Sequence, residues 1–183
     1  MTIMNKTENI ERINTKIADS FERIEASLSE AKDIAGLFEI LLTGIEKEFE
    51  VPYVWLTLID TTMTAPVIEA IKSSDILIDR LKVIKPELFH EILPSGLKPV
   101  LVNKDIQPYY KLLPSTRKYF VKSLALVPFK IKEEIVGSWN NGDAYRDRYT
   151  QDMGTDLLQN LAQLVSVRLT ELVATINNGK LDC

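Results

Sequence analysis

The chain has 183 residues and a net charge of −4, and 45% of its residues are hydrophobic while 26% are charged. These values are typical of one folded domain with a helical extension, and they exclude a disordered or low-complexity chain. The longest apolar stretches span about six residues, far short of the roughly 18 that a membrane helix needs, and the first fifteen residues are polar. The single cysteine, Cys183, excludes an intramolecular disulfide and a thiolate metal cage. We therefore expect a cytoplasmic protein without a membrane anchor.

Charge is distributed unevenly along the chain. Residues 1–50 carry a balance of −5, and residues 71–134 carry a balance of +5. A basic middle segment attracts anionic ligands or nucleic acid, although lysines that merely solvate loops and helices give the same balance. No aromatic motif of the RNA-binding type accompanies these bases, so we do not expect nucleic-acid binding.

Long helices are predicted at both ends of the chain, because none of the eight prolines lies within residues 1–51 or 129–183. Apolar residues recur at spacings of three and four through the N-terminal segment, with charged residues between them. This pattern predicts helices over residues 7–30 and 33–49. A stripe with the same spacing predicts a C-terminal helix over residues 155–177.

The first predicted helix is longer than a small sheet needs. Over residues 7–30 it measures about 36 Å, whereas a strand measures about 20 Å. Its apolar residues Ile10, Ile13 and Ile17 would face water in a monomer. We therefore expect a homodimer through the terminal helices, with residues 1–31 as a dimerising extension.

The middle of the chain has the composition of strands. Residues 53–59 alternate an aliphatic row with a more polar row that contains Tyr53, Trp55 and Thr57. The segments predicted as strands are residues 53–59, 66–71, 99–102, 123–130 and 133–140. The segments predicted as short helices and loops, each broken by prolines, are residues 75–93 and 105–121. This order predicts an α+β fold, in which a central antiparallel sheet carries the N- and C-terminal helices on one face.

The sequence SLALVPF at residues 123–129, followed by polar residues and then IVGSWN, is similar to the hairpin of GAF domains. Residues 33–60 resemble the entry helix and first strand of that family, and residues 98–105 resemble its third strand. The run RYTQDMGTD at residues 148–156 looks like that of a proteobacterial family of small GAF-like proteins of unknown function. The resemblance implies a GAF-like domain over residues 32–178, with a tail over residues 179–183.

Resemblance to GAF domains implies a module for sensing or dimerisation, without naming a ligand. Family members that attach a bilin or reduce methionine sulfoxide need cysteines in the pocket, which this chain lacks, and the cyclic-nucleotide motif is not found. His90 is the only histidine, and no nucleophile motif or phosphate-binding loop accompanies it. We therefore expect no enzyme activity, no metal site and no identifiable cofactor.

A ligand pocket is expected on the face of the sheet opposite the terminal helices. The polar row of residues 53–59 would face it, and so would Ser123, Ala125 and Val127, because small residues open a cavity. Aromatic and basic residues between the strands would form a lid that suits a planar or anionic molecule. The candidate ligand-binding residues are Tyr53, Trp55, Thr57, His90, Tyr109, Tyr110, Arg117, Tyr119, Ser123 and Ala125. The alternatives are that His90 is an ordinary surface residue and that the aromatic side chains fill a closed pocket.

Three functions are compatible with these features. The first is a non-enzymatic, homodimeric GAF-like module that senses a small molecule and signals to an unknown protein partner. The second is a structural or interaction module whose vestigial pocket is filled by Trp55 and Trp139. The third is an enzyme that acts on an anionic small molecule through Arg117 and His90.

Overall fold

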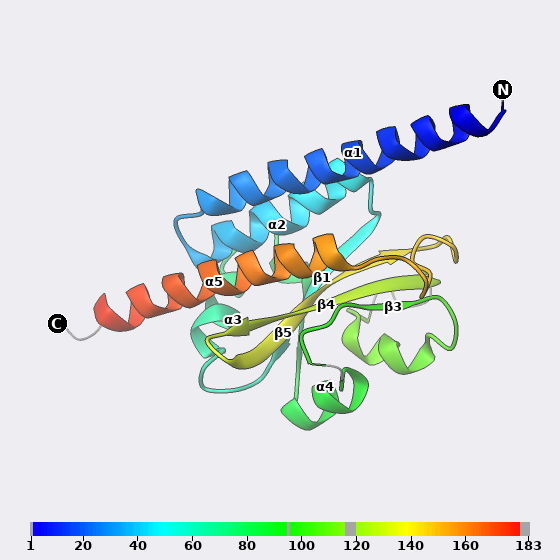
Figure 1. The fold of residues 1–183 in the computed structure, drawn as a ribbon. Helices are drawn as coiled ribbons and strands as arrows, with labels where there is room; N and C mark the ends of the chain where they lie inside the picture. The colour runs from blue at the N-terminus through cyan, green and yellow to red at the C-terminus, as the bar shows by residue number, and fades with distance from the viewer. Residues whose placement is uncertain (1, 95, 116–119, 180–183) are drawn as a thin grey trace.

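The computed structural model describes residues 2–94, 96–115 and 120–179. Within them, three long helices gather on one side of a five-stranded sheet, and two short helices, at residues 86–92 and 107–112, lie on its other side (Figure 1). In chain order the elements are α1 (Thr2–Ser29), α2 (Ile34–Phe49), β1 (Tyr53–Ile59), α3 (Ala65–Lys72), η1 (Ile78–Arg80), β2 (Leu81–Ile84), α4 (Pro86–Ile92), β3 (Val100–Val102), η2 (Gln107–Leu112), β4 (Ser123–Ile131), β5 (Glu134–Asp143) and α5 (Asp156–Gly179).

The strands of the sheet follow the order β2-β1-β5-β4-β3. Neighbouring strands are antiparallel except β1 and β2, which run parallel because α3 and η1 return the chain between them. The predicted α+β class with a central, mostly antiparallel sheet is confirmed, as is the hairpin, formed by β4 and β5. The parallel β1–β2 pair is a feature that the sequence did not indicate.

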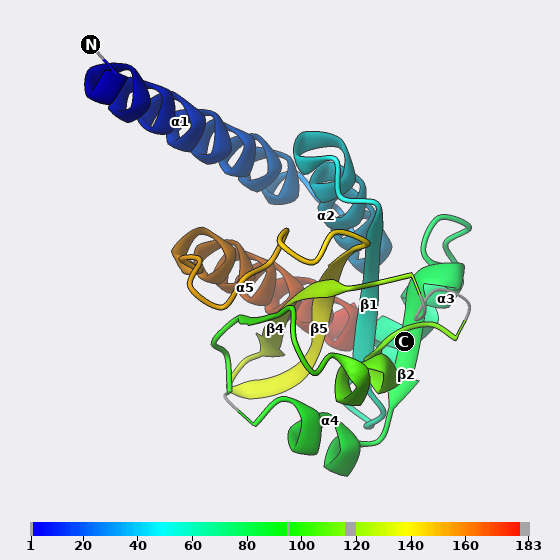
Figure 2. The same cartoon turned by 90° about the vertical axis from the view of Figure 1, so that its right-hand side faces the viewer.

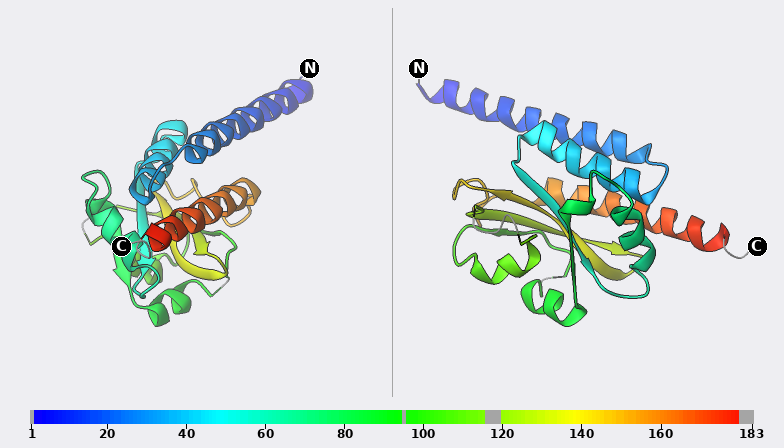
Figure 3. Two further views of the ribbon diagram at one scale, coloured as in Figure 1. Left: turned by 90° about the vertical axis from the view of Figure 1, so that its left-hand side faces the viewer. Right: turned by 180° about the vertical axis from the view of Figure 1, so that it is seen from behind.

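The helices α2 and α5 cover one face of the sheet, and α1 packs on the outer side of these two helices (Figures 1 and 3). The aliphatic row of β1, made of Val54, Leu56 and Leu58, is buried in the core that these helices share with the sheet. Phe38 of α2 and Trp139 of β5 belong to the same core and are fully buried. The predicted packing of the terminal helices, and the direction of this row, are thus confirmed.

A second, smaller core lies on the opposite face, beneath α4 and η2 (Figure 2). It contains Trp55 of β1, Phe89 of α4, Leu112 of η2, and Leu124 and Leu126 of β4. The period of two along each strand therefore separates two cores, one on each side of the sheet.

The prediction of a strand over residues 66–71 is wrong, because this segment forms α3. Pro66 lies in the first helical turn, where its missing N–H is not needed. Val67, Ile68 and Ile71 then recur on one face, which is buried in the core beside α2. The strand β2 lies inside residues 75–93, which were expected to be irregular.

Only the second half of α1 is packed against the rest of the chain. From Phe21 onward its apolar stripe is buried, and the Phe21 and Phe49 ring centroids are 4.8 Å apart. Ile10, Ile13 and Ile17 remain 50%, 48% and 38% exposed, and the first half of the helix projects beyond the sheet (Figures 2 and 3). No helix within the described residues is long and apolar enough to cross a membrane.

Candidate functional site

The face of the sheet opposite the terminal helices carries Tyr53, Trp55 and Thr57, as the alternation predicts. Trp55 belongs to the second core, and its Nε1 donates a hydrogen bond to the Leu112 carbonyl at 2.8 Å. The Thr57 hydroxyl donates to the same carbonyl at 2.9 Å. These bonds hold η2 directly against the sheet, where the sequence predicted an open pocket.

The amide of Asn140 completes this buried polar contact. Its orientation follows from its neighbours: its oxygen accepts from Trp55 Nε1 at 3.0 Å and lies 2.9 Å from Thr57 Oγ1, whose single proton is shared between this oxygen and the Leu112 carbonyl. Its nitrogen donates to the Ser138 hydroxyl at 2.8 Å and to the Trp139 carbonyl at 3.1 Å. Asn140 and Thr57 are both fully buried, so this network is sealed from solvent.

The remaining space beside Trp55 is about 10 Å³, no more than a single water molecule occupies. Trp55 is thus packed against η2, as the alternative of a filled pocket expects at this point of the face. Trp139, the other residue in that alternative, lies instead in the core on the helix side of the sheet.

Of the described lid residues, Tyr109 lines a cavity of about 470 Å³ that Lys104 and Lys111 also line. Tyr109 and Tyr110 are half-buried beside the second core, and the Tyr110 hydroxyl donates to the Val121 carbonyl at 3.2 Å. His90 is exposed in the last turn of α4, next to the buried Phe89. The predicted site residues Arg117 and Tyr119 lie outside the described residues.

The prediction that Ser123 and Ala125 face the same side as Trp55 is wrong. Ala125 pairs with Asn141, which in turn pairs with Val54 of the helix-side row. Because residues that pair across a ladder share a face, Ser123 and Ala125 lie on the helix side. The larger Leu124 and Leu126 supply the apolar volume of the second core instead.

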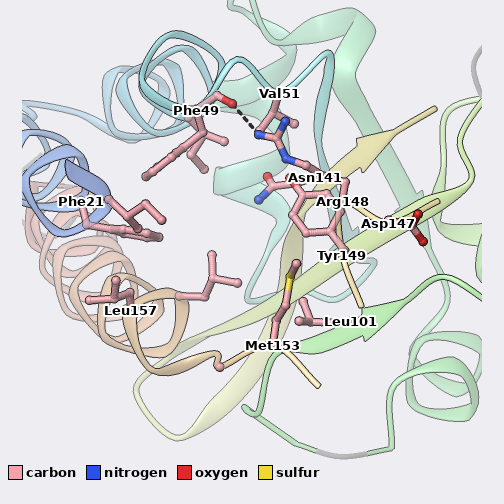
Figure 4. A pocket seen from close by; sticks show the side chains of 14 residues that line it. Phe21, Phe49, Val51, Leu101, Asn141, Asp147, Arg148, Tyr149, Met153 and Leu157 are labelled. Carbon is pink, nitrogen blue, oxygen red and sulfur yellow. Dashed lines mark hydrogen bonds between the residues drawn. The ribbon is translucent and has the colours of Figure 1, made fainter. Parts of the chain in front are cut away.

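A cavity of about 540 Å³ lies on this helix side, at the end of the sheet where α1, α2 and α5 meet (Figure 4). Its size is within the range of small-molecule sites. Its walls are mainly aliphatic and aromatic, and the lining residues are Ile17, Phe21, Ile45, Phe49, Val51, Leu101, Asn141, Asp147, Arg148, Tyr149, Met153, Gly154, Leu157 and Leu158. No sequence pattern predicted this cavity.

Arg148 closes the polar corner of the cavity by holding the loop after β5 against the end of α2. Its guanidinium donates to the Phe49 carbonyl, one of the terminal carbonyls that a helix leaves without an internal partner (Figure 4). It also lies 3.5 Å from the carboxylate of Asp143, which is almost fully buried. The charge of Arg148 is thus compensated within the protein.

The other polar lining residues are Asn141, Asp147 and Tyr149. Asn141 is 3% exposed, and its side-chain oxygen has no hydrogen-bond partner among the described residues. Burial raises the pKa of Tyr149 to about 12, although the nearby Arg148 cation acts in the opposite direction. The phenol is therefore neutral at physiological pH.

Among the described lining residues of the cavity there is no serine, threonine, cysteine or histidine to act as nucleophile or proton relay. The described part of the chain also contains no group of three or more His, Cys, Asp or Glu side chains that could hold a metal ion.

The fold is similar to that of solved GAF domains. The GAF domain of an Acinetobacter phosphoenolpyruvate-protein phosphotransferase matches with a TM-score of 0.52 and 12% identity, over 87% of this chain and 96% of that one. Residues 122–287 of a methyl-accepting chemotaxis protein match with a TM-score of 0.50 and 15% identity, over 84% of this chain and 98% of that one. No family model matches the sequence, and neither does any curated protein. The GAF-like fold is thus shown, whereas the resemblance to small proteobacterial GAF-like proteins stays a prediction.

Proposed function

We propose that this chain is a non-enzymatic GAF-like module that works as a homodimer assembled through α1, with α5 contributing to the same helical layer. The observation that carries the proposal is the exposed apolar stripe of Ile10, Ile13 and Ile17 on the projecting half of α1. Burial of each half-exposed isoleucine contributes roughly 1 kcal/mol. Six such side chains in a symmetric pair would contribute roughly 6 kcal/mol before the entropy cost of association.

The residues around the stripe support a helix–helix contact. Asn9 and Asn14 flank the stripe at the positions that would border a partner helix, and both are uncharged. The charged residues Glu8, Glu11 and Arg12 fall on the outer side of the helix. A second α1 would therefore approach the stripe without burying these charges.

The sheet offers little surface for a competing mode of association. Its two edge strands are β2, with four residues, and β3, with three. Short edge strands make poor templates for pairing with another sheet. Assembly through helices is therefore the favoured route, and any signal would pass through the same helices.

The test is the molar mass in solution of three proteins, measured by sedimentation equilibrium. The wild-type chain is expected to be a dimer at about 10 μM, which requires a net association free energy of roughly 8 kcal/mol. The six isoleucines supply roughly 6 kcal/mol before the entropy cost, so apolar contacts of α5 have to supply the remainder. The double variant Ile10→Asp/Ile13→Asp is expected to be a folded monomer, because both residues are exposed in the single chain. Ile78→Asp is the matched control, because Ile78 is as exposed as Ile10 but lies in η1, away from α1. A monomeric wild type, or a control that dissociates as the double variant does, contradicts the proposal.

A further inference from the structure

We infer that the cavity between α1, α2, α5 and the loop after β5 binds a small, neutral, largely apolar molecule that donates one hydrogen bond to Asn141. This site lies on the other side of the sheet from Trp55. The inference goes beyond dimerisation and does not depend on it.

The shape and lining of the cavity fit an organic molecule. Its volume of about 540 Å³ is in the range of cavities that bury small ligands. Phe21, Phe49 and Leu157 provide aromatic and aliphatic surfaces on one side, and Leu101 and Met153 lie across from Phe21 (Figure 4). The walls are already in place in the single chain, so a ligand would not have to order them.

The polar corner favours a neutral ligand over an anion. Arg148 is the only cation among the described lining residues, and it is engaged by the Phe49 carbonyl and the Asp143 carboxylate. An anion would approach that carboxylate without gaining a free cation. Tyr149, whose pKa is raised by burial, remains a neutral phenol and adds no charge.

Asn141 supplies the specific contact. Its amide is directed into the space between Phe49 and Leu157 (Figure 4). The residue is 3% exposed, and its side chain makes a hydrogen bond with the Tyr149 phenol, while its side-chain oxygen has no hydrogen-bond partner within the described part of the chain. A buried acceptor without a donor is unfavourable, and an N–H or O–H group of a ligand corrects this. Isoleucine side chains from a second copy of the chain have no such donor.

The probe is N-phenyl-1-naphthylamine, a neutral aromatic amine with one N–H donor, whose fluorescence rises in apolar surroundings. We expect saturable binding with one probe per protomer. The anionic analogue 1-anilinonaphthalene-8-sulfonate has the same skeleton plus a sulfonate and is expected to bind at least about tenfold more weakly. No saturable binding, or tighter binding of the sulfonate, overturns the inference.

Two variants test the location. Gly154→Leu places a side chain at the cavity lining, where a Cβ meets no atom within 4 Å, so the fold should persist while affinity falls at least about tenfold. Asn141→Leu should weaken binding of the amine about fivefold. It should not weaken binding of 1-benzylnaphthalene, the analogue without an N–H donor, whose affinity is measured by displacement of the amine. Ile78→Ser, an exposed apolar site elsewhere, is the control and should leave binding unchanged. Amine binding that Gly154→Leu does not weaken overturns the inference.

The monomeric variant separates this inference from the proposed dimer. Ile10 and Ile13 do not line the cavity, so Ile10→Asp/Ile13→Asp should bind the amine as the wild type does. If the amine binds only this variant, a second copy fills the cavity in the dimer, and the inference fails while the dimer stands. A wild type that is monomeric and binds the amine leaves the inference intact and refutes the dimer.

Discussion

Replacing Thr57 by valine is expected to lower the free energy of unfolding by about 2 kcal/mol. Thr57 is fully buried, and its hydroxyl lies 2.9 Å from both the Leu112 carbonyl oxygen and the Asn140 amide oxygen. Valine keeps the shape and the β-branch, but it leaves those two acceptors to share the single N–H of Trp55. One lost hydrogen bond accounts for about 1 kcal/mol, and an under-satisfied buried acceptor adds about as much. The melting temperature should fall by roughly 4–8 °C.

Urea denaturation of the wild type, Thr57→Val and Thr57→Ser measures this effect. Serine keeps the hydroxyl and loses one methyl group, so Thr57→Ser should lower the free energy of unfolding by only about 1 kcal/mol. Unchanged urea dependence of the transition would show that the variants unfold from the same compact state. If Thr57→Val is as stable as the wild type, or more stable than Thr57→Ser, the polar network does not hold η2 to the sheet.

Two further predictions concern backbone packing and pH. Gly137→Ala should lower the free energy of unfolding by about 3 kcal/mol or more, because the new Cβ would lie 2.2 Å from the Thr57 carbonyl oxygen. Gly154→Ala, which has open space around it, should change that free energy by less than about 1 kcal/mol, and thermal unfolding measures both. The folded-state pKa of Tyr149 is raised from 10.0 to about 12, so as pH rises the unfolded chain loses this proton first. The contribution of Tyr149 to the free energy of unfolding is therefore fully present below pH 10 and declines as pH rises towards 12. Between pH 9 and 11 this decline is roughly 1 kcal/mol, and urea denaturation of Tyr149→Phe should lack it; equal slopes in the two proteins would contradict the assignment.

The faces of β1 were predictable because its two rows differ in chemistry. Leu56 and Leu58 alternate with Trp55 and Thr57, and only the aliphatic row suits a core beneath amphipathic helices. In β4 the residues of both rows are mostly apolar, so side-chain size was the only guide, and it pointed to the wrong face. Which row faces which core is decided by the pairing with β5 and β3, which a single sequence does not show.

The cavity could not be predicted from local patterns, because its walls come from segments far apart in the chain. Ile17 and Phe21 were recognisable as an apolar stripe, but the stripe alone does not show which neighbour covers it. The run at residues 148–156 was noticed for its family resemblance, and it supplies Arg148, Tyr149 and Met153. Its role depends on the Phe49 carbonyl, a backbone group that no sequence pattern identifies.

The projecting half of α1 begins at the cavity, so a small rotation of the helix there would produce a larger displacement at its far end. From Ile17, which lines the cavity, back to Thr2, the helix extends about 23 Å at 1.5 Å per residue. A rotation of about 10° at Ile17 would displace the far end sideways by about 4 Å, close to half the distance between the axes of two packed helices. In the proposed dimer, a displacement of that size would change the angle at which the two copies of α1 cross. A small adjustment at the sheet would thus reach the far end of the helix as a change in helix crossing angle.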